Sequence, residues 1–263
     1  MSNYLIDTHC HLHDEEWFAP SQAEQFLRDA AEVNVRQIIV IGTDPADSEA
    51  ARTFAAAHPG VFWTYGVHPE HAGKLDPSAV DASTRSLRGQ PPVAIGEIGL
   101  DYHYDGYDRP AQLRLFEQML QLAQDLRLPV SLHIRERAAF ADAWPLLDNF
   151  PGTRGVVHSF TGSKQDLRRA LERDFYIGVN GLATYSTLAL PPLEKMLLET
   201  DAPFLTPVPF RGTINTPGYV RCVAAYLAEK LGVAEDNLVE QTTKNARQLF
   251  QLGGPLLRPG ESV

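Results

Sequence analysis

Short apolar runs recur along the whole chain, and each is separated from the next by a stretch long enough for a helix or a loop. Near-continuous apolar runs are typical of parallel strands covered on both faces. Eight such runs, each followed by a helical or looped stretch, predict a (β/α)8 TIM barrel. A doubly wound open sheet is the competing architecture. The predicted strands are residues 4–7, 37–41, 61–67, 93–98, 129–133, 155–158, 175–179 and 196–199.

Several of the intervening stretches carry helix-start signals. A capping side chain followed by a proline favours the first turn of a helix, and this pair occurs at Asp44-Pro45, Asp76-Pro77 and Thr216-Pro217. Ser21 and Glu24 have the spacing of a capping box. Residues 108–126 predict an amphipathic helix that stops before Pro129. Its apolar face would consist of Leu113, Phe116, Leu120 and Ala123.

The chain is expected to form one domain over residues 1–263, because no segment has the composition of a linker. Residues 253–263, with glycines, prolines and little periodicity, are expected to be a loose tail. Cys10 and Cys222 lie far apart, which excludes a disulfide framework and fits a reducing cytoplasm. We find neither a signal-peptide pattern nor an apolar stretch long enough to cross a membrane. These features predict a cytoplasmic protein with no membrane partner and no obligate protein partner.

The charge balance limits how this chain can meet nucleic acid. Its 23 basic and 33 acidic residues give a net charge of −10 with histidine neutral. A protein that coats duplex DNA is normally basic, because phosphate contacts supply most of the non-specific affinity. A polyanionic partner must therefore be bound locally, by metal ions or by a few arginines.

Histidines and carboxylates stand where five of the predicted strands end. In a barrel, these ends meet at the catalytic face. Alternation along the first strand sends His9 and His11 to the same side and turns Cys10 away, as a small buried residue. Imidazole and carboxylate together favour Zn²⁺, Mn²⁺ or a related divalent ion, and this many groups make two ions plausible. The candidate ligands are His9, His11, Glu97, His133, His158 and Asp201.

Several motif stretches are spread over nearly the whole chain. They are Asp7-Thr8-His9-Cys10-His11-Leu12, Gly66-Val67-His68-Pro69, Ala94-Ile95-Gly96-Glu97-Ile98-Gly99-Leu100-Asp101-Tyr102, Leu128-Pro129-Val130-Ser131-Leu132-His133, His158-Ser159-Phe160-Thr161-Gly162, Leu198-Glu199-Thr200-Asp201-Ala202-Pro203, Arg211-Gly212-Thr213-Ile214-Asn215 and Thr242-Thr243-Lys244-Asn245-Ala246. Together they resemble the signature stretches of the TatD metal-dependent deoxyribonucleases. The resemblance implies an amidohydrolase-like TIM barrel with one or two divalent ions (Mg²⁺, Mn²⁺ or Zn²⁺), in a family with several 3′→5′ exonucleases on DNA.

The resemblance also implies how the ligands are shared. One ion would be held by His9, His11, Glu97 and Asp201, and the second by Glu97, His133 and His158. The residues support a bridging glutamate, because many related barrels bridge their ions with a carboxylated lysine on the fourth strand. No lysine lies between Lys74 and Lys164 here, so Glu97 is left to supply the bridge.

Two departures from the family pattern stand out. His13 occupies a position where the family commonly has aspartate, and we interpret it as substrate-side or neutral. The segment between Gly181 and Leu193 is shorter than the family's usual helix, which predicts only a turn or a short helix in that place.

Several residues near the predicted mouth have two interpretations. His68 would contact phosphate, transfer a proton, or cap a local turn. Arg135 and Arg211 would each grip a phosphate or form a surface ion pair, for Arg135 with Glu136 or Asp142. Ordinary packing is favoured for Tyr102 and Phe160 over base stacking. His58, His71 and His103 are interpreted as surface or packing residues.

The favoured function is hydrolysis of a phosphodiester in DNA ends or single strands. Asp201 would accept the proton of the attacking water, with Glu97 and His68 as the other catalytic residues. The alternative is a metal-dependent amidase, lactonase or esterase of a small molecule, because the same site can attack a carbonyl carbon. A binding protein on a decayed barrel is disfavoured, since every expected ligand is present.

Overall fold

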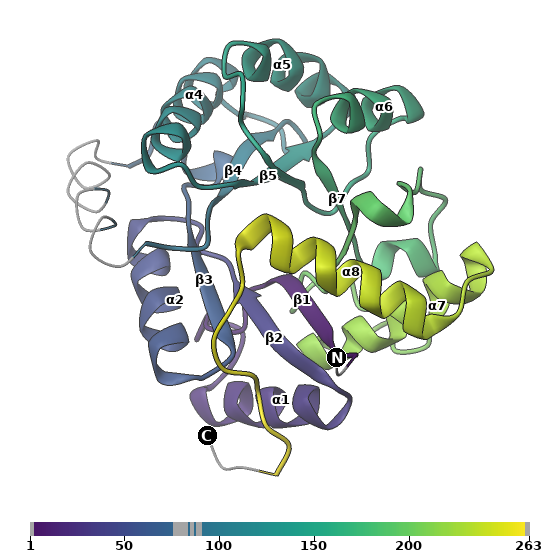
Figure 1. Cartoon of the computed structure of the whole chain (residues 1–263). Coiled ribbons are helices and arrows are strands. Elements are labelled where there is room, and N and C mark those ends of the chain that lie inside the picture. Colours follow the sequence, from purple (N-terminus) through teal and green to yellow (C-terminus); the bar gives the residue numbers. More distant parts are fainter. Residues whose placement is uncertain (1–2, 76–83, 85–86, 88–90, 261–263) are drawn as a thin grey trace.

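Eight parallel strands form the barrel of this protein, which we describe from a computed structural model. The structure describes residues 3–75, 84, 87 and 91–260. The strands follow one another around the sheet in sequence order, and a bridge between Cys10 and Ala202 joins the last strand to the first. This closure confirms the TIM barrel and excludes the open sheet (Figure 1). They are β1 Leu5–Cys10, β2 Val35–Val40, β3 Val61–Tyr65, β4 Ala94–Asp101, β5 Val130–Arg135, β6 Gly155–Val157, β7 Tyr176–Val179 and β8 Met196–Leu198.

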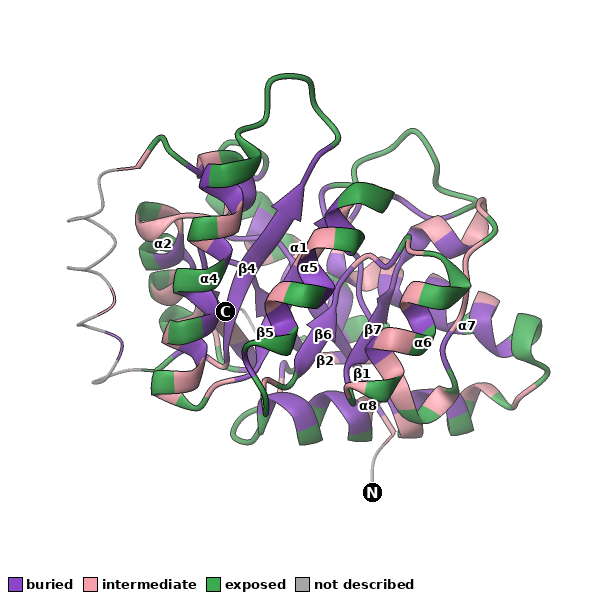
Figure 2. Ribbon diagram, turned by 90° about the horizontal axis from the view of Figure 1, so that it is seen from above, coloured by how far each residue is buried: buried purple, intermediate pink, exposed green. Residues whose placement is uncertain are grey.

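Helices surround the strands, with their buried faces toward the sheet and their outer faces in solvent (Figure 2). This pattern follows from the strand residues, which are buried almost throughout and need cover on both faces. In Figure 2, β4 ends in a long exposed loop at the end of the barrel opposite α8. The described helices are α1 Pro20–Glu32, α2 Pro45–Ala57, α4 Arg109–Leu126, α5 Arg137–Asp148, α6 Lys164–Glu172, α7 Val220–Leu231 and α8 Glu235–Phe250.

The helix-start predictions have mixed outcomes. Asp44 caps α2 by accepting from the amides of Ala46 and Asp47, and Asp108 caps α4 by accepting from Ala111. The capping box at Ser21 is wrong, because α1 already begins at Pro20 and its N-cap is Ala19. Thr216 was also a wrong prediction: it precedes a 3₁₀ turn and its side chain makes no capping bond. Asp76-Pro77 lies outside the described residues.

Two further features shape the barrel, of which the first was not predicted and the second was. Ser163 and Asp166 form a reciprocal capping box at the start of α6. Between β7 and β8 the chain makes only two 3₁₀ turns, Gly181–Thr184 and Leu193–Lys195, as the short segment predicts. Both α7 and α8 then follow β8, and α8 packs against β1 and β8 across the seam that closes the barrel.

The C-terminal residues 253–260 form neither a helix nor a strand. Leu257 is nevertheless buried, and its amide donates to the carbonyl of Arg36 at 2.9 Å. The Arg36 guanidinium donates back to the carbonyl of Leu257. One domain over the whole chain remains a prediction. Among the described residues, no helix is both long and apolar enough to cross a membrane.

Candidate metal centre

All six predicted ligands meet at the carboxyl ends of the strands. His9 lies in β1 and His11 directly follows that strand. Glu97 lies in β4 and His133 in β5. His158 directly follows β6, and Asp201 lies just beyond β8. Residues far apart in sequence therefore converge because parallel strands of a barrel end at the same face. They are His9, His11, Glu97, His133, His158 and Asp201.

Glu97 lies at the middle of the group, and its two carboxylate oxygens face different histidines. Oε2 lies 3.5 Å from Nε2 of His9 and 3.9 Å from Nε2 of His11. Oε1 lies 2.6 Å from Nδ1 of His133 and 2.7 Å from Nε2 of His158. The side chain is almost completely buried, at 5% exposure. Its two oxygens are thus positioned to serve two separate ligand groups.

Asp201 completes the first of these groups. Its Oδ1 lies 3.6 Å from Nε2 of His9 and 3.6 Å from Nε2 of His11. An ion held tetrahedrally at metal–ligand distances of about 2.0–2.2 Å separates its ligand atoms by roughly 3.3–3.6 Å. The donor atoms of His9, His11 and Asp201, with Oε2 of Glu97, are close to that spacing. They are near enough to share one ion.

A second group lies on the other side of Glu97. Nδ1 of His133 is 3.2 Å from Nε2 of His158, and both nitrogens face Oε1 of Glu97. On the far side of its ring, Nε2 of His133 lies 3.2 Å from Oδ2 of Asp101. A carboxylate in that place accepts the ring N–H of a ligating imidazole, which orients the ring and leaves the lone pair of its other nitrogen for the ion. Asp101 is therefore a supporting residue that sequence reasoning did not single out.

His68 approaches the same oxygen from the loop after β3. Its Nε2 lies 3.9 Å from Oε1 of Glu97, while its Nδ1 accepts the backbone N–H of Glu70 at 3.2 Å. Burial and the neighbouring His133 lower the pKa of His68 to about 3, so the ring is neutral. An occupied Nδ1 leaves the proton of the neutral ring on Nε2. His68 thus presents an N–H donor, rather than a lone pair, to the centre.

Several buried polar atoms of the centre have no hydrogen-bond partner. They are both ring nitrogens of His9, Nδ1 of His158 and Oε2 of Glu199. Buried polar atoms are almost always satisfied in folded proteins. Histidine nitrogens and carboxylate oxygens are also the donor set of transition-metal sites. The unpartnered atoms therefore fit the binding of a divalent cation here.

Glu199 is a site residue that the sequence analysis did not select. It is fully buried, and burial raises its pKa to about 7. Its Oε1 accepts the amide of Ser159 at 2.6 Å and lies 3.8 Å from Nδ1 of His158. A methyl group on Gly178 would come within 2.2 Å of its Oε2, so glycine there makes room for the side chain. The available signal was its position as the last residue of the predicted strand 196–199, at the strand end where the other candidate ligands gather.

The buried ionisable side chains of the centre have pKa values that are shifted in opposite directions by their neighbours. Burial works against the charged form of Glu97, but His158 and His9 outweigh it and keep the pKa of that carboxyl well below its usual range. Burial also opposes charge on His11, yet the carboxylates of Asp201 and Glu97 beside it raise its pKa to about 9. His9 goes the other way, because burial and the neighbouring His158 lower its pKa to about 4. Glu97 therefore stays ionised, and His9 stays neutral with a lone pair on one of its ring nitrogens.

Arg135 and Arg211 lie at the mouth, each over an aromatic ring. The Arg135 guanidinium is 5.4 Å from the ring of Tyr104, and that of Arg211 is 3.8 Å from the ring of Tyr185. The nearest carboxylate oxygen to Arg135 belongs to Asp101, at 3.9 Å. Among the described residues, Arg135 forms an ion pair with neither Glu136 nor Asp142. Glu136 instead pairs with His103, and Asp142 pairs with Arg109.

The remaining candidates are structural. Tyr102 is buried and its hydroxyl donates to Asp142, while Phe160 is buried against Phe140, so packing is confirmed for both. His13 is also buried, with Nε2 at 2.9 Å from Oδ1 of Asp47. That contact ties the loop after β1 to the start of α2.

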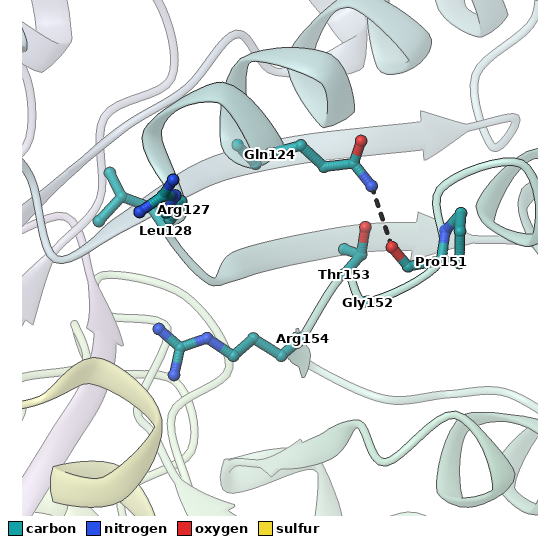
Figure 3. A pocket seen from close by; sticks show the side chains of 8 residues that line it. Gln124, Arg127, Leu128, Pro151, Gly152, Thr153 and Arg154 are labelled. Atoms are coloured by element: carbon teal, nitrogen blue, oxygen red, sulfur yellow. Dashed lines mark hydrogen bonds between the residues drawn. The ribbon is translucent and has the colours of Figure 1, made fainter.

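A cavity of about 440 Å³ lies at the opposite end of the barrel (Figure 3). Its walls come from the end of α4 and the turn before β6, with Gln124, Arg127 and Arg154 among the lining residues. None of the residues of the metal centre lines it. The chemistry described above is therefore carried by the carboxyl ends of the strands and not by this cavity.

Comparison with known proteins agrees with the geometry. The family of TatD-related DNases matches residues 6–251. The uncharacterized metal-dependent hydrolase YabD of Bacillus subtilis is 32% identical over 257 residues, covering 94% of this chain and 99% of that protein. The 3′-5′ ssDNA/RNA exonuclease TatD of Pantoea sp. (strain At-9b) is 33% identical over 246 residues, covering 87% of this chain and 93% of that protein.

A solved structure gives the same answer. The crystal structure of YJJV, a TatD homologue from Escherichia coli K12, superposes with a TM-score of 0.87 at 32% identity. The superposition covers 96% of this chain and 100% of the YJJV chain. Matched motifs, a matched barrel and a cluster of histidines and carboxylates at the strand ends lead to one conclusion. The chain belongs to the TatD-related DNase family of metal-dependent hydrolases.

Proposed function

We propose that this protein is a 3′→5′ exonuclease that removes nucleotides from the ends of single-stranded DNA or RNA. The observation that carries the proposal is Glu97, whose two oxygens face separate ligand groups. Two divalent ions held by these groups would suit the cleavage of a phosphodiester, in which both the attacking and the leaving oxygen develop charge. Support for this substrate comes from relatives such as the Pantoea enzyme, which carries that activity in its name.

The chain's own residues would hold the ions in two sets that share Glu97. His9, His11 and Asp201 form one set with it, and His133 and His158 form the other. Two imidazoles in each set, four in all, favour Zn²⁺ or Mn²⁺ over Mg²⁺. A divalent ion bound there supplies Lewis acidity, which offsets charge on phosphoryl oxygens and acidifies water.

Asp201 is the proposed general base. Its carboxylate is ionised, because His11, His9 and His158 outweigh the effect of burial and lower its pKa. The backbone of Asp201 is left-handed, with φ 59°, and its amide donates to the carbonyl of His9 at 2.8 Å. This bond aims the carboxylate into the centre, where it can accept the proton of an attacking water.

His68, Arg135 and Arg211 would contact the phosphates. The N–H of His68 points toward Glu97 and can donate to a phosphoryl oxygen beside it. The side chain of Arg135 is 40% exposed at the end of β5, where its fork can bind a neighbouring phosphate. Two divalent ions and two arginines would give this acidic protein a local positive potential. Its free cysteines suit a cytoplasmic location.

The test is hydrolysis measured together with metal content. A single-stranded oligonucleotide labelled at its 5′ end should shorten stepwise from the 3′ end, releasing mononucleotides. Activity should disappear with chelation and return with Mn²⁺ or Zn²⁺. A panel of lactones, amides and carboxylic esters is assayed in parallel. Hydrolysis of that panel with no attack on the oligonucleotide would overturn the proposal in favour of carbonyl chemistry.

A further inference from the structure

Two exposed aromatic side chains form a wall beside the metal centre. Trp17 is 49% exposed and Phe204 is 43% exposed. Their ring centroids are 5.2 Å apart at an angle of 78°, an edge-to-face contact. We call this pair the aromatic wall. Large apolar side chains left in solvent beside a hydrolytic centre point to contact with an aromatic or apolar part of the substrate.

The aromatic wall touches the first ligand group directly. The ring of Phe204 is 6.3 Å from the ring of His11, centroid to centroid. Its amide also donates to the carbonyl of Asp201 at 2.8 Å. A group stacked on the wall therefore lies next to the ligands His11 and Asp201, within one nucleotide unit of the reacting phosphate.

Both members of the wall are held by their backbones. The buried Asn215 donates from its side chain to the carbonyl of Phe204 at 2.6 Å. The amide of Trp17 donates to the carbonyl of Asp14 at 3.2 Å, and Asp14 in turn donates to the carbonyl of His11 at 3.1 Å. A surface fixed in this way loses little conformational entropy when a ring stacks on it.

On the side of the mouth opposite the aromatic wall, the chain presents an arginine. Trp17 follows β1 and Phe204 follows β8, and these two strands adjoin where the barrel closes. Tyr104 lies in the loop after β4 and Arg135 ends β5, and these two strands lie across the eight-stranded ring. The centre is thus flanked by an aromatic wall on one side and an arginine on the other. Single-strand binding sites combine these two elements, base stacking and backbone charge.

We propose that Trp17 and Phe204 form the stacking surface for one nucleobase of the nucleotides joined by the scissile phosphodiester. This inference rests on the proposed function and adds its base-binding subsite. Stacking would supply affinity that does not depend on charge, in a protein whose net charge of −10 repels a polyanionic strand at long range. Every base has a flat face, so the subsite is expected to tolerate any sequence.

The experiment compares strands with and without a base. Oligothymidylate is assayed beside the same strand carrying a tetrahydrofuran abasic residue at the 3′ terminal or the adjacent position. Wild-type kcat/KM should fall by about 5- to 100-fold when the stacked base is removed. Trp17→Ala and Phe204→Ala should show a loss of similar size on the full strand, mainly in KM, and no further loss on the abasic strand. Trp17→Phe, which keeps a ring, should retain most of the preference.

Leu231→Ala is the matched control, since it removes a side chain of 37% exposure from the end of α7. Metal content and thermal midpoint are measured for every variant. Wall variants that slow both strands equally, or neither, would overturn the stacking surface while leaving the exonuclease standing. A wild-type protein that hydrolyses neither strand overturns the proposed function, and the base-binding subsite with it.

Discussion

The amide of Asp201 donates to the carbonyl of His9 at 2.8 Å, and this bond joins two candidate ligands across the seam between β8 and β1. It depends on the left-handed backbone of Asp201 and on closure of the barrel through Cys10 and Ala202. Because the bond is made by the main chain, the Asp201 side chain can be exchanged without moving the turn. That separation makes the proposed base directly testable.

Asp201→Asn should keep much of the bound metal and lose about 10²-fold or more in kcat. Asparagine retains one acceptor oxygen for the ion but cannot take a proton near neutral pH. Single-turnover rates and metal content by mass spectrometry check both parts. Near-wild-type turnover with full metal would limit Asp201 to ligation.

Glu97→Ala should abolish hydrolysis and lower the metal content while the barrel stays folded. The side chain holds both ligand groups, and its loss leaves His133 and His158 without their shared anion. Metal stoichiometry, activity and circular dichroism are the readouts, with the exposed Glu240→Ala on α8 as the control. A normal metal count with full activity in Glu97→Ala would contradict the bridging assignment.

His68→Ala should lower kcat by roughly 10- to 100-fold with unchanged metal content, whereas His68→Gln should recover part of the loss. The Nδ1 atom is occupied by the amide of Glu70, so the ring acts through its Nε2–H. With a pKa of about 3 the ring is neutral at pH 7 and contributes a hydrogen bond, of the size expected for one oxyanion donor or less. Loss of one metal ion in His68→Ala would instead make it a ligand.

Arg135→Ala should raise KM for the oligonucleotide more than it lowers kcat. It should also reduce the salt slope of binding by about one, the share of a single phosphate contact. Arg135→Lys should recover charge without the fork and so restore only part of the affinity. Titrations at several salt concentrations measure the slope. If KM and slope both stay unchanged, Arg135 serves only its contact with Asp101 and the ring of Tyr104.

Asp47→Asn should destabilise the fold at pH 7 by about 2 kcal/mol. Burial opposes its charge, but hydrogen bonds from His13 and Thr43 outweigh it and lower the pKa of Asp47 from 3.8 to about 2. The native state therefore binds its proton less readily than the unfolded chain. The stabilisation is complete above pH 3.8 and is lost as the pH falls toward 2.

Urea unfolding of wild type and Asp47→Asn at pH 7, 5 and 3 follows this dependence. The difference between the two proteins should be the same at pH 7 and 5 and smaller at pH 3. Asp105→Asn, in the exposed loop after β4, is the control and should have little effect. A difference that persists unchanged at pH 3 would mean that packing, and not charge, links α2 to the loop of His13.

The strands and the six clustered ligands could be predicted because both depend on local properties of the chain. An apolar run needs cover on both faces wherever it lies, and a histidine at a strand end reaches the mouth in any parallel barrel. The bridging role of Glu97 was implied by the family resemblance and supported by the absence of lysine in that part of the sequence, and it stays a prediction. The strands and the clustering required composition and order, but no knowledge of distance.

Two of the helix-start predictions were wrong because the neighbouring residues decide where the helix begins. Ser21 has a good capping spacing, yet Pro20 already starts α1 and moves the cap to Ala19. Thr216 precedes a proline, but the chain there makes a 3₁₀ turn before α7 begins at Val220. A cap forms only where the incoming backbone lets the side chain reach a free amide. That approach is set by the packing of the preceding loop.

The sequence by itself determined which residue types stand at the strand ends, and hence the fold and the metal chemistry. Only the tertiary structure decided how they face one another: which oxygen of Glu97 meets which histidine, which nitrogen of His68 is already occupied, and that Trp17 lies against Phe204. The physical reason is the range over which each kind of interaction acts. Hydrophobic periodicity acts along the chain, whereas hydrogen bonds and ring contacts act over a few ångströms in space, between residues that the barrel brings together only when β8 closes on β1.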